Sequence, residues 1–337
     1  MTMNNLTGYV LSPLCVQLGV GVIAPFVSPV ARAEIEQAWG MTASALHENA
    51  VELSDQLRAN PVMEVSLGVW SRSHVPDRAR EMLGDLLSAM PTNDAEAQKA
   101  LDEWVTERTR GEITKSPVGV DPETSTAVLA ALVGQMEWLN GPGKSRWVRW
   151  GDSQVEGMAL ACPTEATQMT ADGRTVVVSL PLTHGGAFTL AFSLDHEPEA
   201  LLTDMPTDLV PLTLECPMAS ESRAKRPGDN TVAMPTFTLS TTTNLAEDSA
   251  RWGIERFVSE GAPGLDPSSM QVKATQAATI TVSKQGVKAA AVTGFSVLRS
   301  AAMASQAPSI LLEVDRPFAF VLSMDGFDCR LFEGVYR

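Results

Sequence analysis

The pattern of apolar and polar residues divides the first part of the chain into helices and one strand. Residues 10–27 are apolar nearly all round, which is typical of a helix buried inside a large domain. Residues 31–39 have the pattern of a short amphipathic helix, and Gly40 provides its stop signal. Apolar residues alternate along 62–70 and predict a strand, which leads into a predicted helix over 76–87.

The clearest helix signal lies over residues 93–110. Asn93 and Glu96 have the spacing of a capping box, in which two side chains satisfy backbone N–H groups at the start of a helix. Apolar residues at helical spacing follow, and Gly111 ends the pattern. Residues 126–133 are apolar without alternation, which predicts a strand buried on both faces.

The middle of the chain is rich in predicted strands. Residues 175–180 and 188–192 flank the sequence His-Gly-Gly at 184–186 and predict a hairpin. Residues 231–240 predict a further strand, and 249–257 a short helix. Because no internal repeat and no polar linker divides the chain, we expect one mixed α+β domain over residues 1–337.

The last sixty residues have an unusual order of elements. A strand over 278–282 reaches a polar turn that ends at Gly286, and residues 287–294 that follow are almost all small. A loop over 295–308 then leads to a strand over 309–314. The small residues cannot anchor a core of their own, so they are suited to insertion as a strand into an existing sheet.

Composition and charge narrow the class of protein. The 337 residues are 44% apolar and 19% charged, which indicates a soluble globular protein. The net charge of −15 argues against nucleic acid and anionic membranes as partners, because both require a basic surface; it favours a basic protein partner. No stretch of eighteen residues is apolar without a break, so we expect no membrane span.

The N-terminal apolar stretch and the cysteines bear on the compartment. Residues 11–30 resemble the core of a signal peptide, but no Lys or Arg precedes them and several prolines interrupt them. We interpret them as a buried helix and expect a cytoplasmic protein. The four cysteines are widely spaced without a CxxC pair, which favours free thiols over two disulfides.

Searches for catalytic chemistry in the sequence find little. The four histidines lack a partner at metal-ligand spacing, and there is no GxSxG motif, P-loop or GxGxxG. Residues 184–186 resemble half of an oxyanion loop, but a hairpin turn explains them better, and a hydrolase built on His184 would need esterase activity. We therefore expect no enzyme, no metal and no cofactor.

Several short motifs, in the same order along nearly the whole chain, resemble those of one family, the serpins. The chain resembles a prokaryotic-like member that lacks the first helix. The resemblance implies a single α+β domain with a large mixed main sheet, two further sheets, surrounding helices and an exposed reactive-centre loop. The motifs are Gly8–Pro13, Leu101–Val105 with Thr109–Ile113, Met234–Phe237, Trp252–Ile254, Phe257–Ala262, Lys284–Ala291, Arg316–Phe320 and Leu331–Gly334.

The resemblance also implies a mechanism, which is inhibition of a serine protease. The protease cuts the loop over 287–308, the released segment inserts as a strand into the main sheet, and the acylated protease is dragged along. The side chains are compatible with insertion: every second residue from Val287 is uncharged and could be buried, whereas Lys288 is on the other face. The hinge would comprise Gly286, Val287, Ala289, Ala290 and Ala291.

The family's spacing from the hinge places the cut near Ser300. Arg299 is the one basic residue between Lys288 and Arg316, so cleavage at Arg299–Ser300 by a trypsin-like protease is favoured. Cleavage at Ser300–Ala301 by an elastase-like protease and at Leu298–Arg299 are the alternatives, and a lone loop arginine can also be merely solvated. We expect a monomer whose partner is the target protease.

Some positions depart from the family pattern. The hinge has Val287 where the family has Thr or Ser, and Lys284 where it has Glu. The region that controls opening of the main sheet usually carries Ser, Asn and His; the matching positions here are Cys15, Ala130 and Gln276, whereas Ser12 and Trp138 conform. These departures keep a second hypothesis open, a non-inhibitory serpin whose loop is only a substrate.

Overall fold

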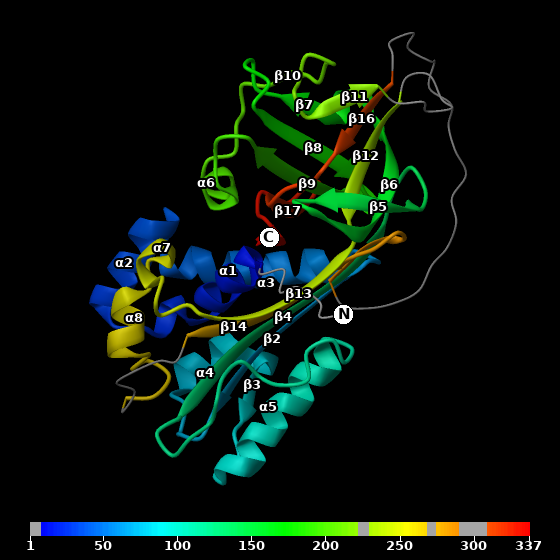
Figure 1. Cartoon of the computed structure of the whole chain (residues 1–337). Helices are drawn as coiled ribbons and strands as arrows, with labels where there is room; N and C mark the ends of the chain where they lie inside the picture. Colours follow the sequence, from blue (N-terminus) through cyan, green and yellow to red (C-terminus); the bar gives the residue numbers. More distant parts are fainter. Residues whose placement is uncertain (1–7, 222–228, 268–273, 290–308) are drawn as a thin grey trace. The chain divides into compact units, whose positions relative to one another are not determined.

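The computed structural model describes residues 8–221, 229–267, 274–289 and 309–337, which form helices and three β-sheets (Figure 1). No helix in these residues is long and apolar enough to cross a membrane. The α-helices are α1 (Pro13–Ile23), α2 (Pro29–Trp39), α3 (Ala43–Ala59), α4 (Asp77–Leu83), α5 (Asp94–Arg108), α6 (Pro198–Thr203), α7 (Ser249–Trp252) and α8 (Glu255–Glu260).

A seven-stranded sheet has the order β1-β18-β17-β9-β8-β7-β10. Its centre is aromatic: Phe188 and Phe320 are fully buried and stack at 5.6 Å between ring centroids. The predicted hairpin is confirmed, because β8 and β9 pair antiparallel around a turn in which His184 has φ 58°. The strands are β1 (Tyr9–Leu11), β7 (Thr167–Met169), β8 (Thr175–Pro181), β9 (Gly186–Ser193), β10 (Val210–Pro211), β17 (Phe318–Met324) and β18 (Phe332–Tyr336).

A five-stranded sheet has the order β11-β16-β12-β6-β5, which leaves β5 as an outer strand. β12 pairs parallel with β16 and antiparallel with β6, and β5 pairs antiparallel with β6. The strands are β5 (Lys144–Trp150), β6 (Ser153–Pro163), β11 (Ala219–Glu221), β12 (Asp229–Pro235) and β16 (Ile310–Glu313).

The third sheet has six strands in the order β13-β14-β15-β4-β2-β3 and is mixed. β2 pairs antiparallel with β4 but parallel with β3. Because it contains the predicted hinge strand β15, this six-stranded sheet corresponds to the predicted main sheet, and we call it the mixed sheet below. The strands are β2 (Met63–Ser71), β3 (Leu87–Ala89), β4 (Thr126–Glu137), β13 (Phe237–Asn244), β14 (Thr275–Val282) and β15 (Gly286–Ala289).

The structure corrects three predicted boundaries. The strand predicted over 231–240 is in fact two strands. β12 ends at Pro235, its last paired residue, and β13 begins after Thr236 in a different sheet. The helix predicted over 249–257 is interrupted at Gly253, whose φ of 63° lies outside the helical region. The helix predicted over 10–27 begins at Pro13, because the residues before Ser12 form β1.

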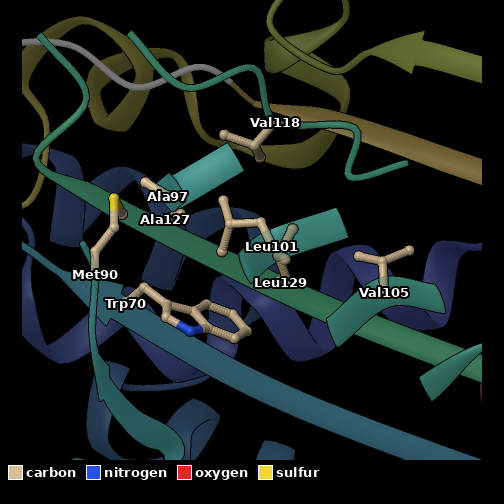
Figure 2. Close-up of a cluster of buried hydrophobic side chains, with 8 residues drawn as sticks. All are labelled: Trp70, Met90, Ala97, Leu101, Val105, Val118, Ala127 and Leu129. Carbon is tan, nitrogen blue, oxygen red and sulfur yellow. The ribbon is translucent and has the colours of Figure 1, made fainter. Parts of the chain in front are cut away.

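Helix α5 forms within the predicted range 93–110, and its apolar face packs against the mixed sheet. Asn93 caps the helix by accepting a hydrogen bond from the backbone N–H of Glu96 at 3.1 Å. The apolar face of α5 forms a buried cluster with side chains of β2 and β4, which Figure 2 shows at close range. The cluster comprises Trp70, Met90, Ala97, Leu101, Val105, Val118, Ala127 and Leu129.

The chain folds into two compact units. One takes its described residues from 1–10, 135–240 and 280–337, and the other from 11–134 and 241–279. The expectation that residues 1–337 behave as a single domain stays a prediction. The hinge belongs to the first unit and most of the predicted sheet-opening region to the second, so each is described by itself below.

Candidate hinge and sheet-opening site

A tight turn connects β14 to β15. Thr281 pairs with Lys288 and Val282 with Val287, and the Ser283 N–H donates to the Gly286 carbonyl at 2.9 Å. β15 lies between β14 and β4 in the sheet order. The first residues of the predicted hinge are therefore paired as an inner strand of the mixed sheet.

Close approach to β4 explains the glycine at the start of the hinge. A Cβ on Gly286 would lie 2.0 Å from the carbonyl oxygen of Met136 and 2.7 Å from the Cα of Glu137. Both are backbone atoms, which cannot move aside as the end of a flexible side chain can. Glycine at this position permits β15 to pack against β4.

Side chains alternate along β15 as predicted. Val287 and Ala289 are each 1% exposed, whereas Lys288 between them is half-buried. Val287, the departure from the family's Thr or Ser, is thus accommodated in the core. Ala290 and Ala291, the other predicted hinge residues, and the predicted scissile residues Leu298, Arg299, Ser300 and Ala301 lie outside the described residues.

Trp138 and the connection after it hold the turn. The Trp138 indole N–H donates to the Ser283 carbonyl at 2.9 Å, and its backbone N–H donates to the Gln285 carbonyl at 3.2 Å. The ring is 4% exposed and packs edge-on against a phenylalanine of β9. This contact makes Trp138 part of the hinge site.

Two residues that the sequence did not single out complete this contact. The Gly143 N–H donates to the Lys284 carbonyl at 2.7 Å, and the Lys284 ammonium donates to the Ser145 hydroxyl at 3.0 Å. Lys284 therefore has a polar partner even though it replaces the family's Glu. No local pattern marks Gly143, since its role depends on contact with a segment 141 residues away in sequence, from position 143 to position 284.

In the other unit, Ser12 and Gln276 form a reciprocal pair. The Ser12 N–H donates to the Gln276 side-chain carbonyl at 2.8 Å, and the Gln276 amide donates back to the Ser12 carbonyl at 2.8 Å. Both residues are more than nine-tenths buried. Gln276 therefore joins β14 to the start of α1 through polar contacts, although it replaces the family's histidine.

Cys15 and Ala130 bring little polar character to this region. The Ser12 hydroxyl accepts from the Cys15 N–H at 3.2 Å and caps α1. Burial raises the pKa of the Cys15 thiol to about 11, against a smaller lowering by its hydrogen bond to Ser12, so the thiol is protonated near neutral pH. Ala130 pairs with Leu67 on β2. All four cysteines are free, as predicted.

The chain beyond the hinge returns to a different sheet. β15 belongs to the mixed sheet, whereas β16 lies in the five-stranded sheet between β12 and β11. Residues 290–309 therefore connect strands of two sheets. A segment cut within this connection would no longer be held at both ends, which is the requirement for it to move.

Known proteins provide an independent comparison. A family model described as Serpin (serine protease inhibitor) matches residues 3–337. Alaserpin of Manduca sexta is 25% identical over 247 residues, which are 68% of this chain and 60% of the length of that relative. The chain thus aligns with three-fifths of that curated protein.

Solved structures share the fold. A cleaved Serpin 42Da superposes with a TM-score of 0.75 at 15% identity, covering 98% of this chain and 92% of that one. Serpin48 of Tenebrio molitor gives a TM-score of 0.68 at 19% identity, with 98% and 91% covered. A thyroxine-binding globulin in complex with thyroxine gives 0.73 at 15% identity, with 98% and 93% covered. The serpin family model spans residues 3–337, and the structure has the same fold as the solved serpins, so this chain belongs to the serpin family.

Proposed function

We propose that the protein inhibits a serine protease by offering the part of residues 287–308 that follows β15 as a cleavable loop and inserting the cut segment into the mixed sheet. The protease, still acylated by the loop, is trapped as the segment inserts. The target we favour is trypsin-like and cuts at Arg299–Ser300. The protein itself supplies no catalysis in this scheme.

The observation that carries the proposal is the position of β15. Val287 and Lys288 of β15 already pair with β14, and the side chains of Val287 and Ala289 are buried. If the same antiparallel register continues, each residue further along the loop pairs with a residue one position earlier in β14. Residue 294 would then face Thr275 at the start of that strand. The next alternate positions have side chains that can be buried. Opposite β14 they are Ala291 and Thr293, and Phe295 and Val297 follow beyond the residue that would face Thr275.

Energetics support insertion once the loop is cut. Each buried Val or Phe side chain contributes roughly 1.5–3 kcal/mol, and each new ladder hydrogen bond contributes about 1 kcal/mol net. Burial of Thr293 with an incompletely bonded hydroxyl costs about 1 kcal/mol or more. These contributions oppose the conformational entropy lost on insertion, about 1–2 kcal/mol for each residue that becomes ordered, and cutting the loop removes the restraint that holds the segment at both ends.

The target preference rests on charge. An arginine on the acyl side of the cut fits the acidic specificity pocket of a trypsin-like protease. The net charge of −15 additionally favours approach of a protease with a basic surface. An elastase-like protease cutting at Ser300–Ala301 is the second candidate.

A denaturing gel after mixing the protein with trypsin in near-equal amounts tests the proposal. We expect a band at the summed mass that survives boiling, and a C-terminal fragment that begins at Ser300. Arg299→Ala should abolish the adduct with trypsin. A parallel reaction with elastase on the same gel distinguishes trypsin-like cleavage at Arg299–Ser300 from elastase-like cleavage at Ser300–Ala301.

A substitution in the hinge separates trapping from cleavage. Ala289→Glu would place a carboxylate at a position that is 1% exposed, so insertion should fail while cleavage continues. Lys288→Glu, at the half-buried neighbour, is the control and should still trap. Quantitative cleavage of the unmodified protein by both proteases without an adduct would instead favour a non-inhibitory serpin whose loop is only a substrate.

A further inference from the structure

The outer strand of the five-stranded sheet has an uncovered stretch of backbone. The Arg149 N–H donates to the carboxylate of Glu313 at 3.2 Å, so at this residue the backbone of β5 points away from β6. In an antiparallel ladder the direction alternates with each residue. The N–H and C=O groups of Ser145 and Trp147 therefore point outward as well.

This uncovered stretch is short and bounded. At one end Gly143 is bonded to Lys284, and at the other Gly151 is bonded to the carbonyl of Asp315 at 3.5 Å. Between them, among the described residues, no backbone partner lies against Ser145 or Trp147. We call residues 144–148 the β5 window. Since paired strands have the same rise of about 3.4 Å per residue, it accommodates a paired segment of about five residues.

The side chains of the β5 window are basic and apolar. Lys144 and Arg146 are exposed and form no ion pair within the described part of the chain, and the Lys284 ammonium lies against Ser145. Trp147 is 65% exposed, the most exposed of the large apolar side chains described. A cationic window of this kind stands out on a chain whose net charge is −15.

We propose that the β5 window binds a short, extended, acidic segment of a partner protein by adding it as an outer strand. The outward backbone groups would supply the pairing, the three cations the preference for Asp or Glu, and Trp147 an apolar contact. The chain's own residues 290–308 do not fit this role, because they contain no carboxylate and their one charged side chain is Arg299. The proposal does not depend on loop cleavage or protease trapping.

A labelled peptide with alternating Glu and Val residues is a direct probe, read by fluorescence anisotropy with the full chain. We expect saturable binding that weakens with salt and is absent for the peptide with Lys in place of Glu. In a paired strand only every second N–H faces β5. We therefore prepare one peptide N-methylated at its odd-numbered amides and one at its even-numbered amides, and expect only one of the two to lose binding.

Two matched pairs of variants test the assignment to β5. Ser145→Pro removes an outward N–H and should weaken binding about tenfold or more, whereas Ser145→Ala should not. K144E/R146E should weaken binding similarly, and R78E/R80E, an equal charge change at exposed positions of α4, should leave it nearly unchanged. Thermal melts confirm that each variant folds.

Several outcomes would overturn the proposal. These are the absence of peptide binding, equal binding by the peptides methylated on either set of amides, and unchanged binding by both Ser145→Pro and K144E/R146E. Loss of binding in R78E/R80E as large as in K144E/R146E would show a general charge effect and would likewise reject the window. Self-association of the protein through β5 without peptide binding would assign the edge to a second copy instead.

Discussion

Substitution of Gly286 by alanine is the sharpest test of the hinge. The added Cβ would lie 2.0 Å from the carbonyl oxygen of Met136 and 2.7 Å from the Cα of Glu137, both far inside contact distance. These atoms belong to the backbone of β4, so relief requires that β15 leave its position between β4 and β14. We expect Gly286→Ala to release residues 286–289 from the sheet while the rest of the fold persists.

The structure sets the size of this effect. Release exposes the Val287 side chain, whose burial contributes roughly 1.5–3 kcal/mol, and breaks ladder hydrogen bonds that contribute about 1 kcal/mol each. A loss of about 3–4 kcal/mol corresponds to an increase of about 10²–10³ in the exchange rate of the amides in β15.

Hydrogen–deuterium exchange with peptide-level mass analysis measures this directly. A peptide that covers residues 286–289 should exchange within the first time points in Gly286→Ala and slowly in the unmodified protein. Gly119→Ala is the matched control, because a Cβ there meets nothing within 4 Å; its exchange over 286–289 should be unchanged. Equal protection of this peptide in Gly286→Ala and the unmodified protein would refute the steric explanation of the hinge.

Two further substitutions test the polar contacts of the fold. Gln276→Leu removes both hydrogen bonds to Ser12 and leaves the buried N–H of Ser12 without the Gln276 acceptor. The free energy of unfolding should therefore fall by about 2–4 kcal/mol. An unchanged midpoint of urea unfolding would contradict the pairing. For Asp315, burial would raise the pKa, but the hydrogen bonds from Arg149 and Arg316 outweigh it and hold the pKa below its ordinary value of 3.8. A lowered pKa in the folded state contributes stability above the unfolded pKa that disappears as pH falls through the folded value. Asp315→Asn should therefore cost stability at pH 6, and the difference from the unmodified protein should shrink below pH 4 in urea titrations. A difference independent of pH would reject this assignment.

Local sequence signals identified most elements correctly because they depend on neighbouring residues. The capping residue Asn93 and the apolar spacing after it located α5 within a few residues, and the turn at 184–186 identified the β8–β9 hairpin. The prediction over 231–240 was wrong because residues that favour strands continue through Thr236, while the apolar positions shift there from Val232 and Met234 to Phe237 and Leu239 as the chain passes from one sheet to another. Alternation reports which face a residue takes and does not report which sheet its strand joins.

In the candidate site, too, features that depend on local sequence were predicted and contacts between distant segments were not. Alternate burial from Val287 followed from residue type and spacing, and Val287 and Ala289 confirm it. The contacts of Gly143 and Ser145 with Lys284 were missed, because neither residue carries a local pattern that points to a distant segment. The replacement of the family's histidine by Gln276 raised doubt from sequence alone; its two hydrogen bonds to Ser12 became visible only in three dimensions.

The sequence by itself determined the family, the mixed α+β class and the register in which small hinge residues alternate, since each depends on residue identity and short-range spacing. The tertiary structure decided that β15 lies between β14 and β4, that Gly286 is needed because of the backbone of Met136, and that β5 is an outer strand with basic side chains. Those facts arise from pairing between segments far apart in the chain, and such pairing depends on packing that no local pattern encodes.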